Sequence, residues 1–334
     1  MVSLPTLVAA AVVGTALTYV ASGRLERSAD RLGAHYGLPP VVQGAVIAAV
    51  GSSMPELASA VLATLLHGEF DLGVGSIVGS AVFNVLVIPA LSALAAGGTL
   101  TTDRDLVYKE ALFYMLAIAA ITLTFALAVI YDPVAGDELR GRVSRPLALA
   151  PLALYGLYAF TQYADTVDHA GDRAPNVAVG RQWLLLAGSL AVIIVGVELL
   201  VQAALGLGET FGTPPFLWGV TVVAAGTSLP DAVVSVRAAR GGDSAVSLAN
   251  VIGSNVFDLL VAVPAGVLFA GAVTVNFSSV TPMMAFLVAV TVVFFAVTRT
   301  DLELGRGEAT GLLVLYGVFV AWMAAEVAGV TTLL

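Results

Sequence analysis

The chain has no cysteine, only three histidines and few charged residues. Without cysteine it forms no disulfide and performs no thiol chemistry. The three histidines are too few and too scattered for a histidine metal site. Charged residues make up 11% of the 334 residues and apolar residues 59%, so too little polar surface remains to coat a soluble globule. The composition therefore indicates a membrane protein.

Ten apolar segments, each about 18–27 residues long, can cross about 30 Å of hydrocarbon as helices. We therefore expect an all-α membrane protein with ten transmembrane helices. No basic stretch precedes the first segment, so we interpret it as a span rather than a signal peptide. The segments are residues 3–22, 39–66, 72–96, 107–131, 146–163, 182–205, 213–239, 244–271, 280–298 and 309–331.

An internal repeat relates the two halves of the chain. GSSMPELASAV recurs as GTSLPDAVVSV, and GSIVGSAVFNVLV recurs as ANVIGSNVFDLLV; these stretches are residues 51–61, 226–236, 75–87 and 249–261. The residues before the first pair, 37–51 and 212–226, also match each other. Five spans per copy is an odd number, so the second copy enters the membrane from the opposite side. We therefore predict two inverted five-helix repeats, residues 1–163 and 182–334, joined by a polar cytoplasmic linker at 164–181.

The distribution of lysine and arginine predicts the orientation. Basic residues favour the cytoplasmic side. If the N-terminus is outside, eleven basic residues lie in cytoplasmic loops and three in outer loops. The eleven are Arg24, Arg27, Arg31, Arg104, Lys109, Arg173, Arg181, Arg237, Arg240, Arg299 and Arg306, and the three are Arg140, Arg142 and Arg145. We expect a multi-pass protein of the cytoplasmic membrane with both termini extracellular.

Each repeat carries a carboxylate directly after a proline inside an apolar segment, as Pro55-Glu56 and Pro230-Asp231. Proline removes a helical hydrogen-bond donor, and the nearby glycines allow the chain to unwind. We therefore predict that helices 2 and 7 are broken at the bilayer midplane. A carboxylate in hydrocarbon is costly, so such a residue normally faces a cavity, a partner or an ion. Two such carboxylates at matched positions of the repeats indicate that they share one site.

Helical spacing places further oxygen donors near these carboxylates. Side chains three or four residues apart share one face of a helix. The pairs are Ser53 with Glu56, Ser228 with Asp231, Ser80 with Asn84, and Ser254 with Asp258, and Ser52 and Thr227 lie beside them in the motifs. All donors are oxygen, which suits hard cations such as Ca²⁺, Na⁺ and K⁺ and favours Ca²⁺ over Mg²⁺.

Charge limits what this site can hold. Glu56, Asp231 and Asp258 need about three positive charges for neutrality, or an unneutralised carboxylate is protonated instead. One Ca²⁺ with one monovalent cation meets this requirement, and so does a set of sodium ions. Protons could also serve, so a calcium/proton antiporter stays open on this argument.

The paired motifs resemble the cation/calcium exchanger superfamily, whose repeats carry G-[TS]-S-x-P-[ED] and G-S-[NA]-x-x-[ND]. Within it, GTSLPDAVVSV, VIGSNVFDLLVAVP and GSIVGSAVFNVLVIPALSA are most similar to the potassium-dependent sodium/calcium exchangers. The resemblance implies a secondary antiporter that exchanges Na⁺ for Ca²⁺ by alternating access, with K⁺ co-transport. The likeness covers about residues 37–97 and 212–271.

The resemblance also implies a role for each site residue. Glu56 and Asp231 would be the central calcium and sodium ligands, and Asp258 would confer potassium dependence. The remaining ligands would be Ser52, Ser53, Ser80, Asn84, Thr227, Ser228, Ser254 and the carbonyls of Ala49 and Ala224. Glu198 and Glu326 lie in apolar segments outside the motifs, and we interpret them as hydrogen-bonded packing or proton-accessible residues.

Other classes fit the pattern less well. Asp231 and Asp258 could form the dyad of an intramembrane aspartyl protease, but a protease needs neither Glu56 nor an inverted duplicate. A channel would share the site, and only coupled flux distinguishes it from an exchanger. The sequence has no ATP-binding motif, which disfavours a primary pump. We expect no enzyme activity, no cofactor, no nucleic acid and no protein partner; the expected partners are the transported ions and the lipid bilayer.

Overall fold

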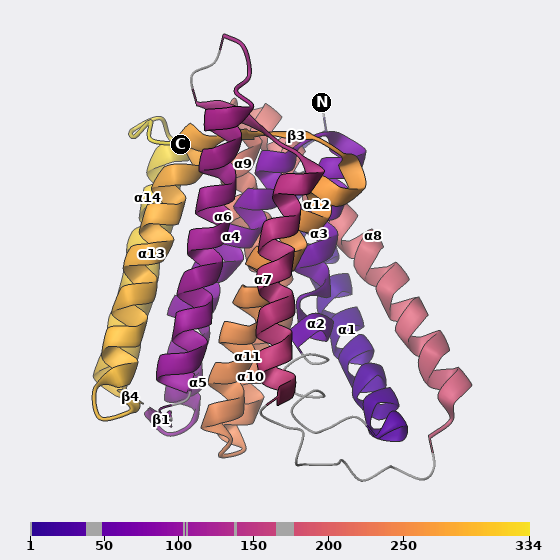
Figure 1. The fold of residues 1–334 in the computed structure, drawn as a ribbon, viewed down its shortest axis with the longest axis vertical. Helices are drawn as coiled ribbons and strands as arrows, with labels where there is room; N and C mark the ends of the chain where they lie inside the picture. The colour runs from indigo at the N-terminus through magenta and orange to yellow at the C-terminus, as the bar shows by residue number, and fades with distance from the viewer. Residues whose placement is uncertain (1, 38–48, 103, 105, 137–138, 165–176) are drawn as a thin grey trace.

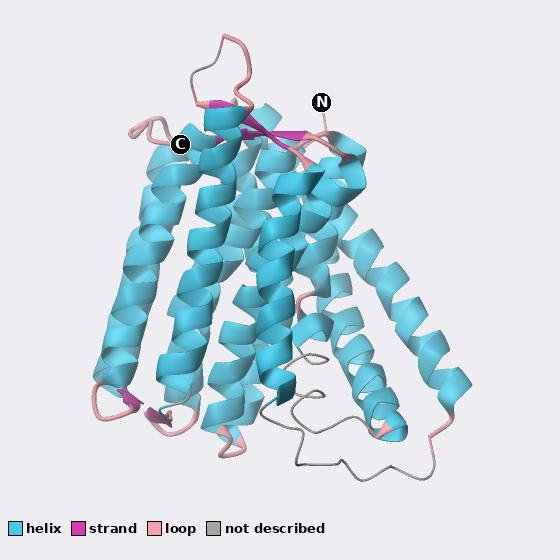
Figure 2. Cartoon of the chain, viewed as in Figure 1, coloured by secondary structure: helices cyan, strands magenta, loops and turns pink. Residues whose placement is uncertain are grey.

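The computed structural model describes residues 2–37, 49–102, 104, 106–136, 139–164 and 177–334. Its long helices run side by side between two ends of the molecule (Figures 1 and 2). In the first half the elements are α1 (Leu4–Tyr36), α2 (Ala49–Ser52), α3 (Met54–His67), α4 (Phe70–Leu86), α5 (Ile88–Ala95), β1 (Thr99–Thr101), the π-helical η2 (Leu106–Glu110), α6 (Ala111–Tyr131), β2 (Arg140–Val143) and α7 (Arg145–Ala164).

The second half has a similar sequence of elements. They are α8 (Val179–Phe211), α9 (Pro215–Trp218), the π-helical η3 (Gly219–Val223), α10 (Ala224–Arg240), α11 (Ser244–Phe257), the π-helical η4 (Asp258–Ala262), α12 (Val263–Ala270), β3 (Val273–Asn276), α13 (Phe277–Arg299), β4 (Glu303–Gly305) and α14 (Arg306–Val327). The strands form two antiparallel pairs, β1 with β4 and β2 with β3, one at each end of the helices (Figure 1).

Eight helical stretches of the described residues are long and apolar enough to cross a membrane. They are Leu4–Tyr36, Phe70–Ala95, Val107–Tyr131, Val179–Phe211, Pro215–Arg240, Ser244–Ala270, Phe277–Arg299 and Arg306–Val327. The protein is thus an all-helical membrane protein, as predicted. The other two predicted spans contain α3 and α7, which fall outside these eight, so the count of ten stays a prediction.

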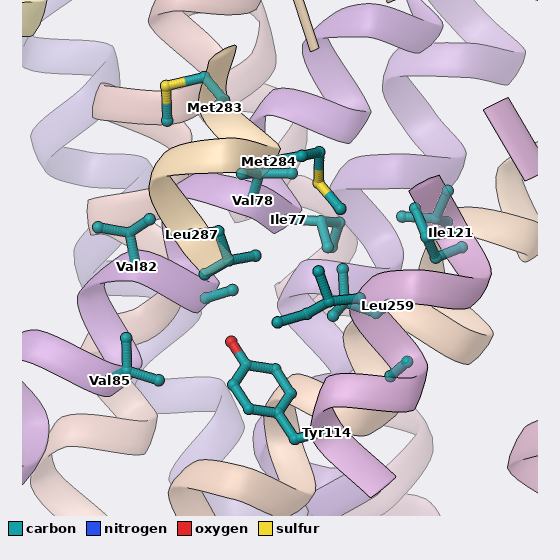
Figure 3. Packing of buried hydrophobic residues seen from close by; sticks show 14 of the residues in the cluster. Ile77, Val78, Val82, Val85, Tyr114, Ile121, Leu259, Met283, Met284 and Leu287 are labelled. Atoms are coloured by element: carbon teal, nitrogen blue, oxygen red, sulfur yellow. The ribbon is translucent and has the colours of Figure 1, made fainter. Parts of the chain in front are cut away.

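The helices differ in how deeply they are buried. In Phe70–Ala95 and Ser244–Ala270, 83% and 89% of the most apolar stretch is buried inside the protein, against 22% in α1 and α14. The buried pair forms the centre, Pro215–Arg240 is 61% buried, and the remaining stretches are 22–39% buried. Figure 3 shows the packing of apolar side chains at this centre, where α4, α6, η4 and α13 meet around Tyr114. Polar groups on the two central stretches are therefore withdrawn from both lipid and water.

Helices 2 and 7 depart from regular helix in different ways. Helix 2 is interrupted at Ser53, two residues before Pro55, as predicted. The predicted break of helix 7 at Gly226 and Pro230 is wrong, because α10 runs through both residues without interruption. The irregular turn is η3, where the N–H of Ala224 bonds to the carbonyl of Gly219. This widened turn ends seven residues before Pro230, which itself lies inside α10.

One further prediction of the linear arrangement is wrong. Helix α1 extends to Tyr36 rather than ending near residue 22, so Arg24, Arg27 and Arg31 lie on this helix and not in a loop. Residues 165–176 of the predicted linker and most of the matching stretch 37–51 lie outside the described residues. Both termini lie at one end of the helices (Figure 1), and α1 and α10 end at the other.

Glycines let α4 pack against η3 and α9 with backbone touching backbone. Gly75 and Gly79 form a GxxxG pair on α4, the spacing that permits close helix contact in membranes. A Cβ at Gly75 would lie 2.6 Å from the carbonyl oxygen of Phe216, and one at Gly79 would collide with the carbonyl of Val220. This contact joins the first half of the chain to the second, one residue from Ser80.

We expect Gly79→Ala to lower the thermal unfolding midpoint of the detergent-solubilised protein. The added methyl group would overlap Val220 and lie 2.8 Å from the Cβ of Ala224, and such overpacking costs about 1–3 kcal/mol. Gly188→Ala on α8 is the matched control, because no atom of the described residues lies within 4 Å of its added Cβ. Equal midpoints for the two variants would contradict the close contact.

Candidate functional site

The predicted site residues come together at the buried centre, on four helical segments. Ser52, Ser53 and Glu56 lie at the interruption of helix 2, Ser80 and Asn84 on α4, Thr227, Ser228 and Asp231 on α10, and Ser254 and Asp258 at the junction of α11 and η4. Ser52 is 2% exposed and the others are fully buried. The helices therefore place polar groups from all four repeat motifs in one region shielded from solvent.

A chain of hydroxyl groups connects Glu56 to the second half of the protein. Ser80 Oγ lies 3.5 Å from Glu56 Oε1 and donates a hydrogen bond to it. Ser228 Oγ donates to Ser80 Oγ at 2.8 Å. This chain joins α3, α4 and α10, so residues from both halves surround the carboxylate.

Two further contacts cross between the halves. Asn84 Nδ2 donates to Asp231 Oδ2 at 3.4 Å. The hydroxyl oxygens of Ser52 and Ser254 lie 3.4 Å apart, and both serines neighbour Asp231. Asp231 thus faces side chains of α2, α4 and α11.

Several oxygen atoms of the site have no hydrogen-bond partner among the described residues. They are Ser53 Oγ, Glu56 Oε2, Asn84 Oδ1, Asp231 Oδ1 and both carboxylate oxygens of Asp258. Buried polar atoms are normally paired, and an unpaired buried carboxylate is especially costly. No lysine or arginine side chain of the described residues is buried that could neutralise the three acids. These unpaired oxygen atoms can therefore act as ligands of a bound cation.

The three carboxylates repel one another, since Glu56 interacts electrostatically with Asp231, and Asp258 with both. Among the described residues, however, no three acidic, histidine or cysteine side chains form a compact metal cluster by themselves. The hydroxyl and amide groups lie between them and supply the remaining oxygens. The arrangement matches a mixed carboxylate, hydroxyl and amide site, which suits Ca²⁺ and Na⁺.

Three predicted ligands occupy less central positions. Thr227 neighbours Glu56, but its hydroxyl donates back to the carbonyls of Val223 and Ala224, at 3.1 and 3.3 Å. The carbonyl of Ala224 is thus already an acceptor within its own helix. Ala49 is the first residue of α2. The two carbonyls remain predictions as ligands.

Asn255 belongs to this network although the sequence reasoning did not select it. Asn84 Nδ2 donates to Asn255 Oδ1 at 2.9 Å, and Asn255 Nδ2 lies 3.0 Å from the hydroxyl of Tyr114 and 3.4 Å from the carbonyl of Ala81. Asn255 directly follows Ser254, where the first repeat has Ala81 after Ser80. That difference between the repeats is the signal that could have found it.

Glu198 and Glu326, which the sequence places in apolar segments outside the motifs, are held by hydrogen bonds away from the site. Glu198 Oε1 lies 2.9 Å from His67 Nε2 and accepts from Gln202 at 2.8 Å. Glu326 accepts from Trp322 at 2.9 Å and from the backbone of Leu333. The interpretation of both as hydrogen-bonded packing residues therefore agrees with the structure.

The chain matches the family model described as sodium/calcium exchanger protein over residues 6–164 and 181–325. It is 28% identical to inner membrane protein YrbG of Escherichia coli over 94% of both chains. It is also 25% identical to sodium/calcium exchanger MaX1 of Methanosarcina acetivorans, covering 88% of this chain and 91% of that one.

Similarity extends to solved structures and to a longer animal protein. The fold superposes on the sodium-calcium exchanger NCX_Mj with a TM-score of 0.64 and 26% identity, over 96% of this chain and 99% of that one. Human sodium/potassium/calcium exchanger 3 is 34% identical over 124 residues, which cover 35% of this chain and 19% of that protein.

We expect Asn255→Ala to weaken Ca²⁺ binding. The change leaves the Tyr114 hydroxyl and the Asn84 amide without their buried partner, a loss that costs about 1–3 kcal/mol. Asn250→Ala is the matched control, because Asn250 lies on the same helix and donates only to Ser235 as its described partner, at 3.0 Å. Calorimetric titration should show weaker Ca²⁺ affinity for the first variant alone, whereas equal affinities would separate Asn255 from the site.

Proposed function

Because the chain belongs to the sodium/calcium exchanger family, we propose that it is a secondary antiporter that exchanges Na⁺ for Ca²⁺ at the buried site. The observation that carries the proposal is the set of three buried carboxylates with free oxygen atoms and no buried basic residue among the described residues. Only cations can neutralise such a site. This makes the protein a transporter rather than an enzyme.

The negative charge of the site explains how it can bind either Ca²⁺ or sodium ions. Ca²⁺ bound between Glu56 and Asp231 balances two negative charges, and sodium ions can balance the same charges in the alternate load. Ligands are Glu56, Asp231, Asn84, the serines of the four motifs, Thr227, and the carbonyls of Ala49 and Ala224. Because the ions compete for shared oxygens, binding of one load displaces the other, which is the basis of exchange.

Potassium co-transport is the finer part of the proposal. Asp258 supplies the third negative charge, which exceeds the charge of Ca²⁺ by one. Both of its carboxylate oxygens lack a hydrogen-bond partner in the described part of the chain, so it is free to hold a monovalent cation. The similarity to a sodium/potassium/calcium exchanger supports K⁺ as that cation.

The proposed architecture has ten membrane helices in two inverted repeats, residues 1–163 and 182–334, with the linker 164–181 on the cytoplasmic side. The helices α1 and α10 carry Arg24, Arg27 and Arg237 at the end opposite the termini, which supports extracellular termini in the cytoplasmic membrane. Alternating access would arise from movement of α1 and α8, which pack together at Gly14 and Gly196, against the core that holds the ligands.

We expect Glu56→Gln and Asp231→Asn each to abolish Na⁺-driven Ca²⁺ uptake in proteoliposomes. Each change keeps the shape of the side chain but deletes a buried anionic ligand of a divalent ion, while loss of one neutral oxygen in Ser53→Ala should weaken transport only partly. Glu198→Gln is the matched control, because that carboxylate lies in a membrane helix outside the site. Uptake at the wild-type rate by either site variant would disprove the assignment.

We expect Ca²⁺ transport to require K⁺ in the wild type and to persist without K⁺ in Asp258→Asn. The amide lowers the negative charge of the site from three to two, which Ca²⁺ alone balances. Ca²⁺ uptake into Na⁺-loaded liposomes, with K⁺ replaced by choline, measures the difference. If wild-type uptake instead follows a pH gradient and ignores K⁺, the protein is a calcium/proton antiporter and Asp258 carries the proton.

A further inference from the structure

A cavity of about 280 Å³ opens between α1 and α10 and reaches the candidate site. The residues that line it include Glu26, Arg27, Ser52, Pro230 and Arg237. Ser52 connects the cavity to the candidate site, because its hydroxyl lies 3.4 Å from that of Ser254 and beside Asp231. We call this space the entrance cavity.

Exposure decreases in steps from the mouth of the entrance cavity to the site. Arg27 and Arg237 are exposed, Glu26 is half-buried, and Ser52 is 2% exposed. Glu26 interacts electrostatically with the carboxylates of Asp30 and Asp231 and with the two arginines of the cavity. It therefore occupies the intermediate position between the solvent and the buried carboxylates.

Away from the entrance cavity, α10 packs closely against α1 and α8. A Cβ at Gly226 on α10 would lie 2.8 Å from Thr15 Oγ1 of α1 and 2.9 Å from Leu200 of α8, so these helices pack tightly there. The cavity of about 610 Å³ at the end near the termini is lined by residues such as Asp71 and Asn276, and by no residue of the site. In this conformation the site is approached from the end opposite the termini.

We propose that Glu26 recruits the transported cations into the entrance cavity before they reach Ser52 and Asp231. The proposal rests on the proposed function and on the orientation that makes this end cytoplasmic. A cation that meets the exposed arginines is repelled, and the half-buried carboxylate behind them offsets that repulsion. A divalent ion gains twice as much as a monovalent ion from this charge, so Glu26 favours Ca²⁺ over Na⁺ at the entrance.

The test compares the KM for Ca²⁺ in everted and right-side-out membrane vesicles. Glu26→Gln should raise the KM at the cytoplasmic face about three- to ten-fold, keep kcat, and leave the KM at the other face unchanged. Arg27→Gln should lower the cytoplasmic KM. The matched control is Asp243→Asn, an exposed carboxylate between α10 and α11 that does not line the entrance cavity and is not among the charges that interact with Glu26. At about 0.5 M choline chloride, screening should remove most of the difference.

Equal cytoplasmic KM values for Glu26→Gln and the wild type, or equal shifts at both faces, would overturn the role of Glu26. Wild-type vesicles without any Na⁺-driven Ca²⁺ flux would instead overturn the proposed function. Val234→Cys gives a second measurement, because Val234 lines the entrance cavity and the chain has no other cysteine. A membrane-impermeant thiol reagent should modify this cysteine from the cytoplasmic face only, and more slowly when Ca²⁺ is present. Modification from the other face would show that the entrance cavity does not open to the cytoplasm.

Discussion

Uncompensated negative charge at the centre of an apolar protein is the constraint on which the rest of the structure depends. Glu56, Asp231 and Asp258 are fully buried, and no buried lysine or arginine of the described residues balances them. Burying an unpaired charge costs several kcal/mol even after the surroundings relax. In the proposed exchanger, bound cations or protons offset that cost, so the same charges that destabilise the empty site would give it affinity for the transported ions.

The packing of the helices serves this arrangement. Because Gly75 and Gly79 have no side chains, α4 packs closely against η3 and α9. This contact holds Ser80 next to Ser228. Hydrogen bonds across the two halves then fix the positions of oxygen atoms that no single helix could bring together. The ligands lie at the interruption of helix 2, on α4, on α10 and at the junction of α11 and η4, while the less buried α1 borders the entrance cavity.

The sequence predicted which residues gather at the buried centre better than it predicted where the helices end. A carboxylate repeated with its serines in apolar segments is a strong signal because burying a charge is costly, and the structure places Ser52, Ser80, Asn84 and Asp231 in one buried region. Helix ends were less predictable, because basic residues such as Arg24 can continue a helix beyond the hydrocarbon. The prediction for helix 7 was wrong because α10 continues through Pro230, and the irregular turn of this helix lies earlier, at η3.

The difference between Asn84 and Asp258 at matched repeat positions has a physical reason in the network. Asn84 Nδ2 donates to both Asp231 and Asn255, at 3.4 and 2.9 Å. An aspartate at position 84 would present an oxygen to each of these acceptors, and its charge would repel Asp231. Asn255, in turn, needs the hydroxyl of Tyr114 and the carbonyl of Ala81, and the first repeat has Ala81 rather than a second asparagine at the matching position. A site with aspartate at both positions would therefore lose the amide donor that holds Asp231, so the asymmetry of charge and the asymmetry of hydrogen bonding depend on each other.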